Sequence, residues 1–376
     1  MAKAYDIAII GAGILGLAHA LAAARAGMRV VVLDRDAQAN GASVRNFGFV
    51  TVTGQQGGDC WRRAMRSRDV WAEVAPQSGI EIVHPGLAVL ARRPEAAAVL
   101  EAFSRTEMGQ GCELLGPAEA ARRFPDITSG APAALLHSPH ERRVESRDAI
   151  PLLAAWLEGA HGVEIRRNTM VLAVEPGAVV TSTGSVSARR IVVCPGDDFL
   201  ALFPERIAAY NVTKCKLHML RLANPGFRLP AAVMSDLGLV RYLGYAELPE
   251  AEALRPILRR EQGAQLDNGI HLIVVQSADG SLVVGDSHHY GATPDPFQPE
   301  AVDRLILDEF EAALGIKAPP VTARWTGIYA SAPDRLMFRD TPMPGVRIVM
   351  ITSGTGASTS FAIAEETITE LQGEIA

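Results

Sequence analysis

Cysteine is scarce in this 376-residue sequence: only Cys60, Cys112, Cys194 and Cys215 occur, and no two of them form a CxxC pair. This pattern argues against a disulfide framework and a zinc site, and we expect no metal ion. Long apolar runs are also lacking, which argues against a membrane span. The first apolar run is interrupted by glycines, unlike a signal peptide, and the cytoplasm is the expected location.

An excess of basic charge is lacking as well. The 36 lysines and arginines are outnumbered by 42 acidic residues, and the formal net charge is −6. This balance argues against nucleic acid or an anionic membrane surface as a partner. The length and the 48% content of hydrophobic residues instead favour a globular enzyme with more than one domain.

The first 34 residues alternate between short β-branched runs and one longer apolar segment. Residues 7–10 and 30–33 have the composition of strands buried on both faces, and residues 14–26 have that of a helix covering them. Gly27 is the expected end of this helix. The order predicts a strand–helix–strand unit.

Glycines occupy the turn between the first strand and the helix, in the run Gly11-Ala12-Gly13-Ile14-Leu15-Gly16. Gly11 permits the tight turn, Gly13 allows backbone to approach a pyrophosphate, and Gly16 allows close packing of helix on strand. Asp34 ends the second strand, where its carboxylate can accept ribose hydroxyls. Together these residues predict a dinucleotide site at the helix N-terminus.

Residues 35–48 are rich in small and turn-forming residues. A surface loop is one interpretation. Because the segment follows the second strand of a nucleotide fold, it can also run back along the bound dinucleotide. The candidate contacts in it are Arg35, Ala42, Ser43, Arg45, Asn46, Phe47 and Gly48.

The C-terminal end repeats the pattern of strand, glycine turn and helix. Residues 346–351 form a buried run, residues 352–359 a turn, and residues up to 370 a helix. This turn is either an ordinary connection or a second helix N-terminus facing the same crevice, where its dipole would stabilise a reduced flavin. Both ends of the chain then belong to one sheet, with the middle inserted.

Strands outnumber helices in the middle of the chain, which breaks the strand–helix alternation. We therefore predict an α/β fold with a Rossmann-type nucleotide-binding domain and an inserted, mainly antiparallel β-sheet domain for the substrate. The nucleotide-binding domain comprises residues 1–80, 144–213 and 323–376. The substrate domain comprises residues 81–143 and 214–322.

Four stretches resemble the D-amino-acid-oxidase superfamily of FAD amine oxidases, which includes glycine oxidase and sarcosine oxidase. They are the run from Gly11 to Gly16, the Gly41-Ala42-Ser43 loop, the strand end Val193-Cys194-Pro195-Gly196 and the turn Ser353-Gly354-Thr355-Gly356. The resemblance covers nearly the whole chain and implies a glycine oxidase-like fold with FAD as the dinucleotide. It adds Val171, Gly196, Gly354, Thr355, Gly356, Ala357, Ser358 and Thr359 as cofactor contacts.

A narrower resemblance is to the FAD oxidoreductases of aminophosphonate catabolism. It is carried by the loop from Ala42 to Gly48, the segment from Val284 to Gly291 and the run from Trp325 to Ala330. It implies oxidation of 2-aminoethylphosphonate, or its N-methyl form, to phosphonoacetaldehyde. Oxygen or another acceptor would then reoxidise the flavin.

One position departs from the glycine and D-amino-acid oxidases, in which an arginine of a Gly-x-Arg stretch holds the substrate carboxylate. The matching stretch here is Gly327-Ile328-Tyr329. Tyrosine cannot form the bidentate ion pair of arginine, so an α-amino acid is disfavoured unless Arg335 compensates. The stretch also lacks the cysteine by which sarcosine oxidases tether flavin, which implies non-covalent FAD.

A phosphonate requires two or three cationic or donor groups. The candidates are His288, His289, Tyr329 and Arg335, with Arg45 as a further one. Each also has a structural interpretation, and adjacent histidines on a strand point to opposite faces and do not readily share a metal. Two rival hypotheses stay open: an oxidase of sarcosine, glycine or another small α-amino acid, and a flavin-binding redox sensor or subunit without turnover.

Overall fold

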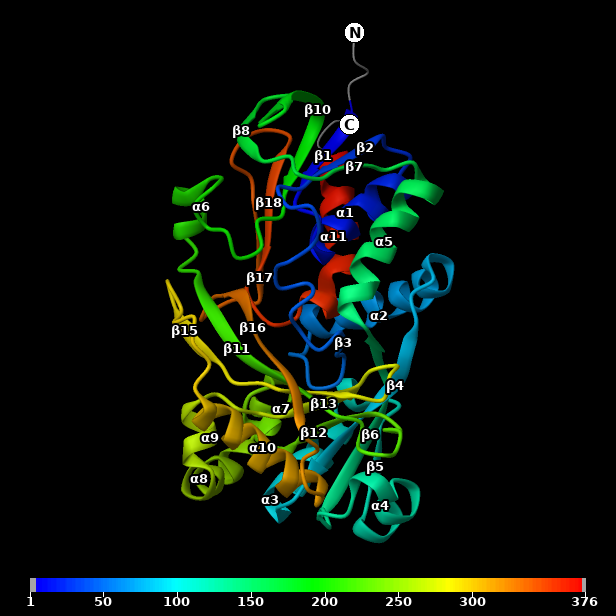
Figure 1. Cartoon of the computed structure of the whole chain (residues 1–376), viewed down its shortest axis with the longest axis vertical. Helices are drawn as coiled ribbons and strands as arrows, with labels where there is room; N and C mark the ends of the chain where they lie inside the picture. The colour runs from blue at the N-terminus through cyan, green and yellow to red at the C-terminus, as the bar shows by residue number, and fades with distance from the viewer. Residues whose placement is uncertain (1–4, 374–376) are drawn as a thin grey trace.

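The computed structural model describes residues 5–373 and contains two large sheets with helices packed on them (Figure 1). The first sheet, in the upper part of Figure 1, has the strand order β17-β18-β10-β1-β2-β7, with the β8–β9 hairpin attached to β10. Its strands are β1 (Tyr5–Ile10), β2 (Val30–Leu33), β7 (Glu164–Arg166), β8 (Val171–Glu175), β9 (Ala178–Thr181), β10 (Gly184–Val193), β17 (Met337–Asp340) and β18 (Val346–Ile351).

Parallel pairing joins distant parts of the chain in this sheet. β1 lies between β10 and β2, and β18 pairs with β10, all in parallel. Successive residues of β1 face opposite sides of the sheet. Ile7 and Ile9 pack with the helical layer, and Ala8 packs with the layer that includes the β8–β9 hairpin. Residues buried on both faces explain why these strands consist of uninterrupted apolar runs.

The helices that cover one face are α1 (Ile14–Arg25), α2 (Asp59–Ser78), α5 (Ser146–His161) and α11 (Gly356–Gly373). α1 ends at Arg25, close to the end expected at Gly27, and the C-terminal helix begins at Gly356 directly after the glycine turn. Helix α2 is held against α11 by a bidentate ion pair between Arg63 and Glu366 at 2.8 and 2.9 Å. The N- and C-terminal units therefore form one packed layer.

The second sheet, in the lower part of Figure 1, has the order β15-β11-β14-β13-β12-β4-β6-β3, with β16 paired to β11 and β5 to β6. Its pairs are antiparallel except β12 with β4. Its strands are β3 (Phe49–Val50), β4 (Ile82–Ala91), β5 (Glu113–Leu115), β6 (Ala134–Val144), β11 (Thr213–Leu222), β12 (Ala232–Ser235), β13 (Ile273–Gln276), β14 (Leu282–Gly285), β15 (His289–Gly291) and β16 (Val321–Ser331).

Shorter helices accompany the second sheet. They are α3 (Pro94–Ser104), α4 (Pro117–Arg123), α7 (Leu243–Ala246), α8 (Ala251–Glu261), α9 (Gly263–Asp267), α10 (Glu300–Leu314), and the 3-10 helices η1 (Glu107–Gly109), η2 (Pro125–Ile127) and η3 (Asp236–Val240); α6 (Pro204–Ala208) lies beside the first sheet. Within residues 5–373, no helix has both the length and the apolar character needed to cross a bilayer.

The division of the chain into five segments remains a proposal, and sheet membership supports it. The strands of residues 81–143 belong to the second sheet and those of residues 144–213 to the first. Some strands do not follow the proposed borders. β3 pairs with β6 although it lies within residues 1–80, and β16 continues nine residues beyond 322, to Ser331, while β6 and β11 each overlap a border by one residue, at Val144 and Thr213.

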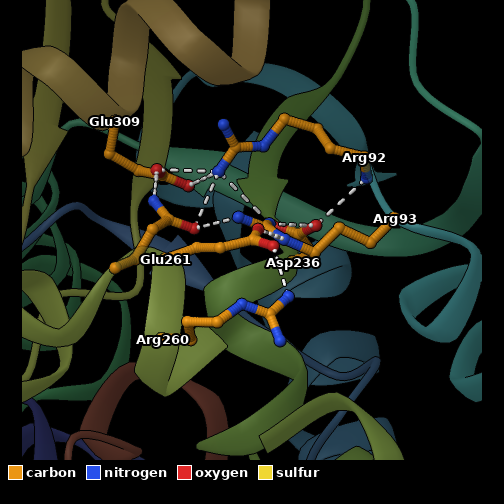
Figure 2. Close-up of polar contacts among 7 residues, drawn as sticks. Arg92, Arg93, Asp236, Arg260, Glu261 and Glu309 are labelled. Atoms are coloured by element: carbon orange, nitrogen blue, oxygen red, sulfur yellow. Dashed lines mark hydrogen bonds and ion pairs between the residues drawn. The ribbon is translucent and has the colours of Figure 1, made fainter. Parts of the chain in front are cut away.

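A buried charge network fastens the helices to the second sheet (Figure 2). Glu309 on α10 and Asp236 at the start of η3 are both fully buried. Arg92, just after β4, places Nη2 2.8 Å from both carboxylate oxygens of Glu309, and Arg93 places Nη1 2.8 Å from Asp236 Oδ2. Because a buried carboxylate without a partner is costly, each arginine is required by the acid beside it.

We expect Arg92→Met to lower the free energy of unfolding by about 3 kcal/mol or more, since it leaves Glu309 charged and buried without its ion pair. The matched control is Arg260→Met, because Arg260 pairs with Glu261 at the surface and its side chain is 70% exposed. This control should cost less than about 1 kcal/mol. Urea unfolding of the holoprotein measures both, and equal losses would contradict the assignment.

Candidate functional site

Two cavities open at the carboxyl ends of β1 and β10, which are parallel neighbours in the first sheet and from which the chain continues to α1 and toward the second sheet, respectively. The first, here the strand-edge cavity, has a volume of about 350 Å³ and is lined by Gly11, Asp34 and Val171 among others. The second, here the domain cavity, has a volume of about 440 Å³ and reaches from Gly13 to the second sheet. Gly13, Ser43 and Gly196 line both, and such a crevice is where open α/β sheets bind ligands.

The glycine turn leaves no room for side chains. Gly11 has φ of +103°, and a Cβ there would lie 2.6 Å from the carbonyl oxygen of Cys194. A Cβ on Gly16 would lie 1.8 Å from the carbonyl oxygen of Gly11, and one on Gly13 would lie 2.9 Å from Ser43 Oγ. The turn can therefore present bare backbone to a ligand.

Side chains from two loops hold this turn in place. Asp34 Oδ2 accepts a hydrogen bond of 2.6 Å from the backbone N–H of Ala12. Ser43 Oγ accepts one of 2.9 Å from the N–H of Ile14, the first residue of α1. One of the N–H groups expected to face the phosphates is thus already bound by Ser43, and the loop of residues 35–48 is fastened to the helix N-terminus.

Most of the predicted cofactor contacts line the two cavities. In the strand-edge cavity they are Gly11, Gly13, Asp34, Arg35, Ala42, Ser43, Arg45, Val171 and Gly196. In the domain cavity they are Gly13, Ile14, Leu15, Gly16, Ala42, Ser43, Asn46, Phe47, Gly196, Gly354, Thr355, Gly356 and Ala357. The two glycine turns therefore face one continuous groove, although individual contacts remain proposals.

Three predicted contacts lie elsewhere and make internal contacts. A Cβ on Gly48 would lie 1.8 Å from the carbonyl oxygen of Val144, so this glycine is required by packing between segments. Ser358 Oγ accepts a hydrogen bond from the N–H of Thr51, and Thr359 Oγ1 donates one back to the carbonyl of Thr355. Ser358 and Thr359 lie in the first turn of α11, whereas Ser360, one residue further, lines the domain cavity, and sequence proximity alone does not reveal which side of the helix faces the cavity.

Tyrosines and one arginine form the far wall of the domain cavity. Tyr290 on β15 and Tyr329 on β16 both pair with Cys215 of β11, from opposite sides. Arg241 donates a hydrogen bond of 2.9 Å from Nη2 to the hydroxyl of Tyr290. Burial opposes the charge of Arg241, but Tyr290, Tyr329 and nearby Asp286 together raise its pKa, so it stays cationic.

The two adjacent histidines separate as a strand requires. His288 lines the domain cavity with Tyr290, and its Nδ1 donates a hydrogen bond of 2.9 Å to the carbonyl of Gly269. His289 points away, with its ring centroid 5.4 Å from that of His218. The expected contribution of His289 to an anion site is therefore not supported, because adjacent residues of an extended chain face opposite sides, and His288 and Tyr290 are the ones that line the cavity.

Arg335 also lies outside the residues that line the two cavities. Its guanidinium forms a bidentate pair with Asp334 at 3.0 and 2.6 Å and lies 5.0 Å from the ring centroid of Tyr210. This geometry fits the interpretation of Arg335 as a turn arginine paired with its neighbour. At this position Arg335 does not replace the arginine that holds the substrate carboxylate in glycine and D-amino-acid oxidases.

The cavity also contains residues that the sequence argument missed: Arg241, Tyr242, His271, Asp286 and Tyr290. Asp286 and Tyr290 belong to the resemblance segment but were not singled out. Arg241 had one usable signal, since it is a single charge within the otherwise uncharged run of residues 237–246. A charge in such a run is more often functional than one in a polar loop.

Comparison with known proteins agrees with this geometry. A family model described as FAD dependent oxidoreductase (DAO) matches residues 6–370, so the chain belongs to this family. Glycine oxidase from Bacillus cereus ATCC 14579 has a similar structure with a TM-score of 0.77 and 16% identity, covering 98% of this chain and 95% of that one. The glycine oxidase-like α/β fold predicted above is confirmed.

Two further structures share the fold. L-proline dehydrogenase from P. horikoshii gives a TM-score of 0.76 with 18% identity over 98% of this chain and 94% of that one. L-alpha-glycerophosphate oxidase from Mycoplasma pneumoniae, solved with FAD bound, gives 0.74 with 15% identity over 98% and 95%. No curated protein is significantly similar in sequence.

FAD is the cofactor of this family, and the groove fits it. The side-chain-free turn at Gly13 suits a pyrophosphate, and the carboxylate of Asp34 lines the strand-edge cavity where a ribose would lie. The turn at Gly354 and the N-terminus of α11 line the domain cavity at its border with the second sheet, where they would face the flavin ring. The expectation of an FAD-dependent oxidoreductase is therefore confirmed.

We expect Gly13→Val to abolish FAD binding, because the side chain would collide with Ser43 Oγ and fill the pyrophosphate position. Absorbance of the purified protein at the flavin bands measures the bound cofactor. The control is Gly159→Val on the exposed face of α5, where a Cβ meets no atom within 4 Å, and this variant should remain yellow. A yellow Gly13→Val protein would contradict the assignment.

We also expect FAD to be held without a covalent bond. Of the four cysteines only Cys194 lines these cavities, beside the Gly11 turn, and burial raises the pKa of its thiol, so a reactive thiolate is not formed. Precipitation with acid should release all the flavin into the supernatant. Flavin that remains with the precipitated chain would contradict this expectation.

Proposed function

We propose that this enzyme oxidises a small amine bearing an anionic group, specifically 2-aminoethylphosphonate or its N-methyl form, to phosphonoacetaldehyde. FAD, when bound, supplies the acceptor for the hydride and its electron pair. The imine of the substrate is then hydrolysed to the aldehyde. The aminophosphonate is supported by the resemblance carried by residues 42–48, 284–291 and 325–330, and by the polar groups of the domain cavity.

The observation that carries the proposal is the position of Arg241. Among residues 5–373 its guanidinium has no ion-pair partner within 4.0 Å, yet it lines the cavity beside the flavin turn and donates to the hydroxyl of Tyr290. A cation fixed by a hydroxyl and lacking a carboxylate is suited to an anion brought by the substrate.

The charge and shape of a phosphonate suit this wall. A phosphonate carries more negative charge than a carboxylate near neutral pH and offers three acceptor oxygens. Arg241 and the hydroxyl of Tyr290 line the same cavity and provide several donors for it, whereas the hydroxyl of Tyr242 already has His271 Nε2 as a partner at 3.3 Å. The hydroxyl of Tyr329 lies 3.8 Å from the Cβ position of Gly354, so this residue closes the cavity above the second glycine turn and would exclude water there.

Arg241 also favours a second candidate, an oxidase of sarcosine, glycine or another small α-amino acid. The sequence argument disfavoured a carboxylate because Tyr329 replaces the expected arginine. The guanidinium of Arg241, the residue that follows η3, reaches the same cavity from another part of the chain. This guanidinium can form a bidentate ion pair with a substrate carboxylate.

Anaerobic flavin reduction distinguishes the two candidates. We expect 2-aminoethylphosphonate or its N-methyl form to bleach the flavin far faster than β-alanine, its carboxylate counterpart, or sarcosine and glycine. If β-alanine or sarcosine reacts as fast as the aminophosphonates, the aminophosphonate assignment is wrong.

Substitution of Arg241 tests the anion site directly. Arg241→Met should lower kcat/KM for the anionic substrate about ten- to a hundredfold, the loss typical of a charged hydrogen bond. A simple amine without the anion should be much less affected. The matched control is Arg335→Met, which removes an arginine whose partner is Asp334 and should leave kcat/KM unchanged. Equal effects of the two substitutions would contradict the role of Arg241.

A further inference from the structure

A cluster of one carboxyl group and two imidazoles lies in the domain cavity beside the anion site, and the hydroxyl of Tyr242 lies 3.3 Å from His271 Nε2 in it. Asp286 Oδ1 lies 3.4 Å from His271 Nε2, and Asp286 Oδ2 lies 3.7 Å from His288 Nε2. All three side chains are buried, with exposed fractions of 4%, 3% and 8% in the order Asp286, His271, His288. Their nearest ligand atoms all lie within 4.8 Å of one another.

The orientation of His288 determines what it presents to Asp286. Its Nδ1 carries the hydrogen, because the carbonyl of Gly269, 2.9 Å away, can only accept. Burial, together with the charge of Arg241, lowers the pKa of both His271 and His288 well below the ordinary range, so both rings are neutral. Nε2 of His288 is then a bare lone pair facing the carboxyl group.

Asp286 Oδ1 is buried and has no hydrogen-bond partner among the described residues. A buried acceptor of this kind is costly unless a donor reaches it. The carboxyl group and the imidazoles therefore form a site for a donor with several hydrogens. An ammonium group has three.

Charge balance distinguishes an ammonium from a metal ion. The same cavity contains Arg241, whose positive charge already acts on Asp286. A divalent cation would add two positive charges beside that guanidinium. A molecule with both an ammonium and an anionic group adds no net positive charge, because its anionic group pairs with Arg241 and its ammonium with Asp286.

We propose that Asp286, with His271 and His288 beside it, binds the ammonium group of the substrate and accepts its proton. This inference rests on the proposed function, since it places the amine of that substrate. The N–H bond breaks, an O–H bond forms on the Asp286 carboxyl, and the electron pair remains on nitrogen. The neutral amine is then ready to lose hydride to FAD, and the proton returns to solvent before the next turnover.

The electrostatic surroundings suit a proton acceptor. Burial raises the pKa of Asp286 to about 7, although Arg241 lowers it in part. A carboxyl group whose pKa lies near the working pH is a stronger base than an ordinary one. The titratable and charged groups that face Asp286 are His271, His288, Arg241, Tyr242 and Cys215. Because only the ionised carboxylate accepts, flavin reduction should accelerate as the pH rises through about 7.

The test compares the holoenzyme with Asp286→Asn, Asp286→Glu and a surface control, Asp267→Asn, whose residue is exposed and pairs with Arg259. Asp286→Asn should slow anaerobic flavin reduction at least a hundredfold and remove its rise with pH, and Asp286→Glu should restore part of the rate. Binding of ethylphosphonate, an anion without an amine, should remain within about twofold in all variants. The control should match the wild type throughout.

Three results would overturn the inference: an unchanged pH profile in Asp286→Asn, an equal loss of ethylphosphonate binding, or a stoichiometric metal ion in elemental analysis of the wild type. The proposed function fails separately. If aminophosphonates do not reduce the flavin but sarcosine or glycine does, the same variants are measured with that amine. The rate and pH profile of flavin reduction by that amine then decide the role of Asp286. If no amine reduces the flavin, both proposals fail.

Discussion

The parallel pairing of β1 with β10, and of β10 with β18, is the constraint on which the rest of the structure depends. It brings together strands that begin at residues 5, 184 and 346, so both glycine turns leave the same edge of one sheet. Each turn leads into a helix whose N-terminus carries partial positive charge. Two such helix N-termini suit a long anionic dinucleotide with an electron-accepting ring better than a single one does, because one can face the pyrophosphate and the other the ring.

The inserted sheet provides what the nucleotide-binding sheet lacks. Its strands β11, β15 and β16 place two tyrosines beside Cys215, and Arg241, directly after η3, adds its guanidinium. The buried network around Glu309 and Asp236 holds η3 and α10 together, and Arg241 directly follows η3. Rigid support of this kind keeps a binding site in a defined geometry.

Opposite charges share one cavity wall, and this arrangement restricts the ligand. Arg241 remains cationic because its neighbours stabilise its charge, whereas His271 and His288 are neutral because burial removes theirs. Asp286 is the acidic member of the set. A small molecule carrying both an ammonium and an anionic group complements this wall, and a neutral or purely cationic amine does so less well.

The sequence by itself determined the local features. The β-branched run before Gly11, the three glycines, Asp34 and the turn at Gly354 each depend on neighbours close in the chain, because strand burial, turn geometry and helix initiation are local properties. The fold class and a dinucleotide site followed from the order of these units, and FAD from the resemblance of these stretches to a family. Only the tertiary structure decided which side chains meet in the cavity. Arg241, His271 and Asp286 come from separate segments brought together by strand pairing and helix packing, and His289 and Arg335 lie outside the residues that line the cavity because the direction of a side chain depends on strand register and on its local ion pair.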